Sequence, residues 1–313
     1  MSKLMKIAAP ALIGIDVCIA TFKRPTLLED LLHSLIAQDL TGLRLRIIVI
    51  DNDREQSARR AVTKFGDICP FEVVYDVEPQ QNIALARNRA LSHVTSDYCA
   101  FIDDDEAASP LWLRSLLDCL NRYDADIVFG PVISALPDDA PAWAKSCFSR
   151  TRRHTGELLQ VGGTNNALLR RSVLADPSAR FNPAFGLTGG EDTDFFYRQF
   201  LQGHRLIWCD QAIVTEPVAD SRLTLQWIRR RGFRGGQTYY RIFVSRYSSI
   251  RKVAWFGIKA LQLIGGALAA PILRATSYPS YVALTVRMAG ASGQLSRCFA
   301  REDFEEYNVR HYQ

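Results

Sequence analysis

The sequence lacks the cysteine and histidine patterns of a disulfide framework or a zinc site. Its seven cysteines are scattered, odd in number and never spaced as Cys-x-x-Cys, and its five histidines show no ligand spacing. Such cysteine usage is typical of a reducing compartment. The short basic start of the chain has no cleavable-signal architecture. We therefore expect the bulk of the protein to stay in the cytoplasm.

Acidic residues are missing from one long segment. Residues 221–301 contain no Asp or Glu and fourteen Arg or Lys, whereas residues 1–220 carry 29 acidic and 23 basic side chains. A basic block of this kind favours a polyanionic partner, namely nucleotide phosphates, an anionic lipid surface or nucleic acid. Within this block, residues 221–252 interleave arginines with aromatic residues. The same interleaving is found in nucleic-acid-binding proteins. No nucleic-acid-binding motif accompanies them here, and we expect no nucleic-acid partner.

No repeat or low-complexity tract interrupts the first 132 residues, in which short β-branched runs alternate with helical patterns. Strands are expected at 13–20, 45–50, 71–75, 98–102 and 126–132. Helices are expected at 26–38, up to about 65, 83–93 and 111–121, the first of them capped by Thr26. This alternation predicts an α/β fold with a doubly wound, mainly parallel sheet.

Polar residues collect just after the predicted strands. Thr21 and Arg24 follow the first strand, Asp51 ends the second, and the three carboxylates 103–105 follow the fourth. Open α/β sheets bind ligands at this edge. Adjacent carboxylates repel by about 1 kcal/mol even in water. The cluster therefore either holds a cation or is a solvated helix-capping turn.

A second acidic motif begins a later helix. Glu191 and Asp192 follow Gly189 and Gly190, and the helical pattern continues to Leu201. The free N–H groups and positive dipole end of a helix N-terminus keep such carboxylates ionised. Simple helix capping is the alternative for this pair.

The order of these motifs resembles family 2 of the nucleotide-sugar glycosyltransferases, which have the GT-A fold. The resemblance runs from about residue 12 to residue 216. It is carried by five segments, Thr21–Pro25, Val49–Asn52, Asn82–Asn88, Phe101–Asp105 and Gly189–Asp192. Within the family, the chain is most similar to bacterial exopolysaccharide transferases of the succinoglycan-assembly type.

The resemblance implies a metal-dependent donor site. Asp105, with Asp103 beside it, would hold Mg²⁺ or Mn²⁺, whose charge offsets that of the diphosphate leaving group. The base, expected to be uracil, would be recognised by Asp51. The nucleotide-sugar contacts would come from the sheet edge: Thr21, Arg24, Asp51, Arg87 and Asp104. A salt bridge between helix and sheet is the alternative for Arg87.

The resemblance also implies an inverting displacement. Asp192 would be the general base for the acceptor hydroxyl and Glu191 would orient the acceptor, with Asp194 as the second candidate for the base. Transfer of a single sugar is expected, because the Gln-x-x-Arg-Trp signature of processive synthases is absent. Many relatives have a histidine that completes the metal shell; here Glu216 stands at about that place. It either replaces the histidine or has no role.

The segment 221–313 is expected to form a separate helical region beside a catalytic domain of residues 1–220. Residues 221–252 suit a helix that Gly235 and Gly236 interrupt. The apolar stretches 253–273, with a central Lys259, and 278–295 suit either core-packing helices or an interfacial hairpin on anionic headgroups. We expect peripheral or monotopic association with the cytoplasmic face of the inner membrane. A polyprenyl-diphosphate-linked saccharide acceptor would fit that location.

Two other functions are compatible with such a sheet. A nucleotidyltransferase would need a Gly-rich phosphate loop after the first strand, and residues 20–25 contain no glycine. A non-catalytic, membrane-bound nucleotide-binding scaffold would have no need of the acidic residues at both motifs.

Overall fold

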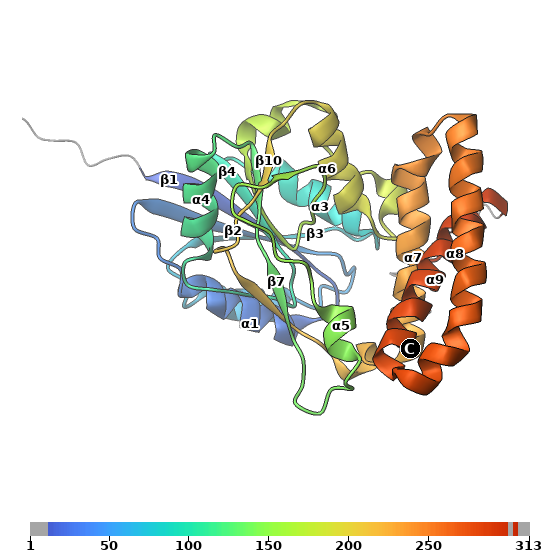
Figure 1. Cartoon of the computed structure of the whole chain (residues 1–313). Coiled ribbons are helices and arrows are strands. Elements are labelled where there is room, and N and C mark those ends of the chain that lie inside the picture. Colours follow the sequence, from blue (N-terminus) through green and yellow to red (C-terminus); the bar gives the residue numbers. More distant parts are fainter. Residues whose placement is uncertain (1–11, 300–302, 306–313) are drawn as a thin grey trace, which may run out of the picture.

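A computed structural model describes residues 12–299 and 303–305; the basic start and the chain beyond residue 305 lie outside the described residues. An eight-stranded sheet forms the centre of the molecule (Figure 1). In spatial order its strands are β3 (Glu72–Val77), β2 (Leu43–Asp51), β1 (Ile13–Thr21), β4 (Tyr98–Ile102), β9 (Asn166–Arg170), β6 (Ile127–Phe129), β10 (Leu206–Trp208) and β8 (Leu158–Leu159). Only β8 and β9 pair antiparallel to their neighbours in this sheet. The predicted mainly parallel α/β fold is confirmed.

Helices cover both faces of the sheet because each central strand is apolar on both sides. Ile47 and Val49 belong to one buried cluster, and Ile48 and Ile50 to the other. Successive strand residues point to opposite faces, so a run of this kind needs two layers of helices. The first face is covered by α1 (Pro25–Ile36), α2 (Arg59–Gly66) and α4 (Trp112–Arg122), and the second by α3 (Ile83–Ser92) and α6 (Glu191–Leu201).

The strand order changes direction at β1, which has β2 on one side and β4 on the other. A ligand-binding crevice forms at such a switch point, beyond the carboxyl ends of the strands. Thr21 at the end of β1 pairs with Asp51 at the end of β2, and β4 leads directly into Asp103. The polar residues predicted at one edge of the sheet therefore lie there.

The predicted strand 126–132 is wrong as a single element. The chain leaves the main sheet after β6 and enters a second, three-stranded sheet of β5 (Ala107–Ala108), β11 (Val214–Pro217) and β7 (Val132–Ala135). Gly130 lies at the transition, where an added Cβ would collide with the carbonyl oxygen of Ala212. Pro131 follows and has no N–H for a strand ladder.

The predicted cap at Thr26 is also wrong. Helix α1 begins at Pro25, and Arg24 occupies the N-cap position without a capping bond from its side chain. Proline suits the first helical position, where no N–H partner is needed. The side chain of Arg24 extends toward the carboxylates of the sheet edge instead.

The C-terminal region consists of α7 (Leu225–Ile242), α8 (Ser249–Thr276) and α9 (Tyr278–Phe299), with α9 packed against both of the others (Figure 1). Short helices complete the chain: α5 (Ala144–Phe148), η1 (Arg171–Ala175), η2 (Pro183–Phe185), η3 (Asp220–Arg222) and η4 (Val244–Arg246). The predicted interruption at Gly235 and Gly236 is wrong, because α7 runs through both. An added Cβ on Gly236 would collide with the carbonyl oxygen of Gly290 in α9. This glycine permits a close helix crossing.

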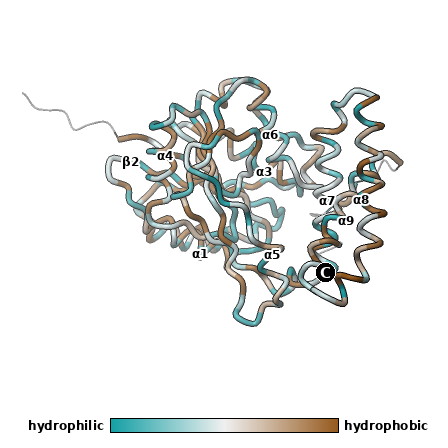
Figure 2. Tube along the Cα trace, viewed as in Figure 1, coloured by the Kyte–Doolittle hydropathy of each residue, from teal (hydrophilic) through white to brown (hydrophobic). Residues whose placement is uncertain are grey.

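Helix α8 turns its apolar side outward. Ile250, Leu261 and Leu268 are 84%, 69% and 72% exposed, whereas Lys259 and Gln262 are half-buried and joined by a hydrogen bond of 3.1 Å. Among the described helices, α8 alone has the length and apolar composition to cross a membrane. Figure 2 shows its hydrophobic residues along the side of the molecule away from the main sheet. Core packing therefore does not account for this face of α8.

The two adjacent glycines of α7 are expected to respond oppositely to alanine. Gly236→Ala should destabilise the protein by about 1–3 kcal/mol through overpacking against α9. Gly235 is exposed and has open space around it, so Gly235→Ala should stabilise the helix by up to about 1 kcal/mol. Denaturant unfolding in mild detergent measures both. Equal effects of the two substitutions would contradict the close crossing.

Candidate active site

The turn after β4 is held by groups from the end of β1. Asp104 is buried, and its carboxylate accepts hydrogen bonds from Thr21 Oγ1 at 2.7 Å and from Arg24 Nη1 at 3.2 Å. Burial raises the pKa of Asp104 to about 6, although the Arg24 guanidinium opposes that rise. These three predicted site residues therefore form one network.

Asp105 and Glu216 share an arginine that sequence analysis did not single out. Arg222, in η3 just after β11, donates to Asp105 Oδ2 at 3.1 Å and to Glu216 Oε1 at 2.6 Å. Arg24 also contacts Asp105 Oδ2 at 3.1 Å, and Arg150 contacts Glu216 Oε2 at 2.6 Å. No local motif signals this cluster, because its members come from four distant segments of the chain.

Arg87 joins the two acidic motifs. Its buried guanidinium contacts Asp103 at 3.0 Å on one side and ion-pairs with Glu191 on the other. Burial raises the pKa of Glu191 to about 7, while Arg87 lowers it in part and the neighbouring Asp192 raises it. The salt bridge considered as the alternative role of Arg87 is present, and it links α3 to the β4 turn and to α6; nucleotide contact by Arg87 stays a prediction.

The turn that presents these carboxylates is itself anchored. Glu106 is buried and accepts a 2.8 Å hydrogen bond from the backbone N–H of Asp103. Burial is also the first cause of raised pKa values at Asp103 and Glu106, and the Arg87 guanidinium offsets part of the shift at Asp103. The low-dielectric surroundings therefore favour a bound counter-charge at this turn.

Asp192 lies in the first turn of α6, whose N-cap is Gly190 with a φ of 92°. An added Cβ on Gly190 would collide with Thr238 of α7, so the helical region packs on this loop. Asp192 is not the N-cap residue, but its Oδ1 accepts a 2.6 Å hydrogen bond from the backbone N–H of Thr193 in the first turn of α6. Its Oδ2 would lie 3.2 Å from a Cβ built on Gly163.

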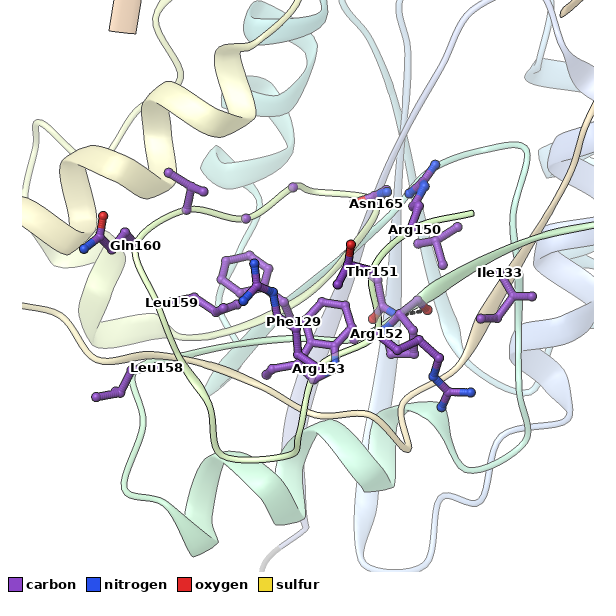
Figure 3. Close-up of a pocket in the computed structure, with 18 residues that line it drawn as sticks. Phe129, Ile133, Arg150, Thr151, Arg152, Arg153, Leu158, Leu159, Gln160 and Asn165 are labelled. Carbon is purple, nitrogen blue, oxygen red and sulfur yellow. Dashed lines mark hydrogen bonds between the residues drawn. The ribbon is translucent and has the colours of Figure 1, made fainter. Parts of the chain in front are cut away.

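Gly163 lines a cavity of about 530 Å³ (Figure 3). Phe129 and Trp208 contribute aromatic surface to it, and the chain 150–153 borders it with three arginines. Arg150, Arg152 and Arg153 are paired with Glu216, Asp210 and Glu157, respectively. The cavity thus combines apolar rings with paired charges next to Asp192.

Asp51 belongs to neither network of the β4 turn. It is fully buried, and its carboxylate accepts from the N–H groups of Asp53 and Ala58, at 3.1 and 2.8 Å, and from Tyr75 Oη at 2.9 Å. In this arrangement Asp51 holds the loop that precedes α2. Because Asp51 is fully buried, a direct contact with a base requires this loop to move.

The carboxylates of Asp103 and Asp105 suit a divalent cation that also binds substrate phosphates better than a preformed metal site made by protein ligands alone. Within residues 12–299 and 303–305, no three potential ligands converge. Mg²⁺ is commonly held by one or two carboxylates together with substrate phosphates. Asp103 and Asp105 fit that chemistry, since both are carboxylates on the same turn.

The Glu191 carboxyl should make stability depend on pH. Because its pKa is raised from 4.5 to about 7, the folded chain binds this proton more tightly than the unfolded chain. The resulting stabilisation is present below pH 4.5 and is lost as the pH rises to about 7, by up to roughly 3 kcal/mol. The unfolding free energy of wild type minus that of Glu191→Gln should fall across this range in urea titrations. Parallel pH profiles would contradict the shift.

Comparisons with known proteins agree with this geometry. The family described as Glycosyl transferase family 2 matches residues 16–176. The chain is 36% identical over 300 residues to the succinoglycan biosynthesis protein ExoM of Rhizobium meliloti, covering 95% of this chain and 96% of that protein. It is 27% identical over 236 residues to a glucosyl-dolichyl phosphate glucuronosyltransferase of Haloferax volcanii, covering 71% and 74%.

A solved structure shows the same fold. The mannosyltransferase PcManGT from Pyrobaculum calidifontis, in complex with GDP-Man and Mn²⁺, has a TM-score of 0.68 at 17% identity and covers 92% of this chain and 88% of its own. This likeness confirms the GT-A architecture. With the match over 16–176 and the relative at 36% identity, the chain belongs to glycosyltransferase family 2 and is a glycosyltransferase.

Proposed function

We propose that this glycosyltransferase moves a single sugar from a nucleotide-sugar donor to a saccharide acceptor with inversion. The observation that carries the proposal is the double contact of Arg87, which holds Asp103 and Glu191 on one guanidinium. It would bring the acidic turn of the sheet edge next to the first turn of α6, which contains Asp192. A donor site and a proton acceptor are thereby neighbours, as a direct displacement requires.

The donor side is assigned to the edge between β1, β2 and β4. Asp103 and Asp105 would hold Mg²⁺ or Mn²⁺, which neutralises charge on the departing diphosphate. The nucleotide pocket would be lined by Thr21, Arg24, Arg87 and Asp104. Asp51 would recognise the base. UDP is the expected nucleotide. The structure of PcManGT, in complex with GDP-Man and Mn²⁺, supports a metal-bound nucleotide. GDP-sugars are therefore the second group of donors to test.

Asp192 is the proposed general base. It is half-buried beside Gly163, which lines the cavity, and from there it would take the proton of an acceptor hydroxyl. Asp194 is the weaker candidate, because it is buried and its Oδ2 is 2.9 Å from Arg198 Nε. Glu191, held by Arg87, would orient the acceptor through the start of α6.

The acceptor is assigned to the cavity lined by Phe129 and Trp208. Aromatic faces supply apolar contact area for a sugar ring, and the polar rim suits its hydroxyls. Similarity to a succinoglycan biosynthesis protein supports a role in exopolysaccharide or surface-glycan assembly. The relative named for a glucosyl-dolichyl phosphate substrate supports a lipid-linked acceptor.

The proposed location is the cytoplasmic face of the inner membrane. The outward residues of α8 repeat every three or four positions, including Ile250, Leu261 and Leu268, while Lys259 is on the half-buried side. A one-sided stripe suits a helix that lies in the membrane interface. A spanning α8 would draw its partner α9, and the arginine-rich α7 packed on α9, into the bilayer, which is costly. We therefore favour monotopic association, with α8 against the lipid.

Turnover of UDP- and GDP-sugars, with and without Mn²⁺, tests the chemistry. Asp192→Asn should reduce sugar transfer or background hydrolysis by about 10²–10⁴-fold while nucleotide binding stays unchanged. Asp194→Asn is the matched control on the same helix and should keep turnover within a few-fold. Nucleotide binding without turnover in any acceptor mixture would favour the scaffold function. Release of pyrophosphate from a sugar phosphate and a nucleoside triphosphate would indicate a nucleotidyltransferase.

Flotation with phosphatidylglycerol vesicles tests the location. Wild type should float with the vesicles, and the double variant Ile258→Glu, Leu261→Glu should lose most of that binding because both residues are on the outward face. Ile68→Glu and Leu201→Glu, at exposed apolar sites of the main domain, should bind as wild type does. Wild type that stays soluble at low salt without detergent would contradict membrane association.

A further inference from the structure

Two guanidinium groups already occupy the carboxylate that is assigned to the cation. Arg24 and Arg222 each lie 3.1 Å from Asp105 Oδ2. The side chain of Asp105 is only 11% exposed and that of Arg222 only 21%, so this charge pairing is poorly screened by solvent. A divalent cation on Asp105 would therefore compete with these arginines for the same oxygen.

Arg222 has a second anchor that does not depend on Asp105. Its Nη1 donates to Glu216 Oε1 at 2.6 Å, and the other oxygen of Glu216 accepts from Arg150 at 2.6 Å. Its guanidinium also lies over the ring of Trp227, 5.8 Å from the centroid. Nη1 is fixed by Glu216, whereas Nη2 faces the acidic turn at Asp105.

Glu216 is consequently unsuited to complete the metal shell. Both of its oxygens are taken by arginines, at distances typical of strong charge-assisted hydrogen bonds. Binding a metal through Glu216 would leave Arg150 and Arg222 without this partner in a half-buried site, which is unfavourable.

We propose that Arg222 binds the diphosphate of the donor and that Glu216 positions Arg222 for this contact instead of ligating the metal. The proposal rests on the proposed function, since it assumes a nucleotide-sugar donor at the sheet edge. Asp105 would hold the cation, and the Arg222 guanidinium would then leave Oδ2 of Asp105. Arg222 keeps its bond to Glu216 and turns Nη2 to an oxygen of the diphosphate. Arg222 would thereby add a planar donor, suited to phosphate, to the charge that a cation on Asp105 would supply.

Metal and nucleotide binding, measured separately, test this assignment. Free Mn²⁺ is followed by electron paramagnetic resonance during titration of the full chain in detergent, first alone and then with UDP. Arg222→Gln should bind Mn²⁺ alone as well as wild type or better, because a competitor is removed, and should bind UDP with Mn²⁺ about 10–100-fold more weakly. Arg222→Lys keeps the positive charge but cannot contact Glu216 and the diphosphate at the same time. Its affinity for UDP should lie between the affinities of wild type and Arg222→Gln.

Glu216→Gln separates a positioning role from a metal-ligand role. It should leave the binding of Mn²⁺ alone within about twofold of wild type and weaken UDP binding. Loss of Mn²⁺ binding in Glu216→Gln, to the level of Asp105→Asn, would overturn the proposal. UDP binding by Arg222→Gln equal to that of wild type would overturn it too.

A control variant separates failure of this proposal from failure of the proposed function. Arg89→Gln removes an arginine that pairs with Asp76 at 2.6 Å, away from the acidic turn, and should bind both probes as wild type does. If wild type itself bound neither Mn²⁺ nor UDP, the proposed function would fail and this inference with it. Circular dichroism and thermal unfolding confirm that the variants compared are folded.

Discussion

Charge neutralisation at the carboxyl edge of the sheet is the constraint on which this molecule depends. Asp103, Asp104 and Asp105 follow a buried strand, and the side chains of Asp104 and Asp105 are only 7% and 11% exposed, so that leaving them unpaired would cost several kcal/mol. Each is paired with an arginine from elsewhere in the chain: Arg87 with Asp103, Arg24 with Asp104 and Asp105, and Arg222 with Asp105. The arginines thereby draw α1, α3 and the start of the C-terminal region to one point.

Hydrogen bonds from another arginine tie the loop before α6 to the helical region. Arg241 of α7 donates to Thr188 Oγ1 at 2.8 Å and to the carbonyl of Ala184 at 2.9 Å, in the loop that leads into α6. The α6 N-terminus also packs on Thr238 through Gly190. The boundary predicted at residue 220 remains a proposal, and Thr238 of α7 contacts the two glycines that precede α6. If α8 binds lipid as proposed, a shift of α8 would be transmitted through α9 and α7 to the loop before α6.

The fold could largely be predicted because its signals are local. Strands apolar on both faces and separated by helical patterns allow few arrangements other than a covered parallel sheet. The predictions of secondary structure were wrong where a contact with a distant segment determines the local structure. Gly235 and Gly236 resemble a helix break until α9 lies against them, and the strand at 126–132 divides because Gly130 must pass the backbone of Ala212. Neither partner is visible from the residues nearby.

The sequence by itself determined the family, the acidic turn after β4, the acidic start of α6 and the basic, acid-free C-terminal third. These are properties of residue order, and side-chain chemistry follows from them directly. Only the tertiary structure decided which carboxylate each arginine neutralises, that Glu216 is held by Arg150 and Arg222, and that α8 turns its apolar face outward. Ion pairs such as Arg150–Glu216 and Arg222–Asp105, whose members are 66 and 117 positions apart, leave no periodic trace in a sequence. Their geometry exists only once the sheet has brought the strand ends together.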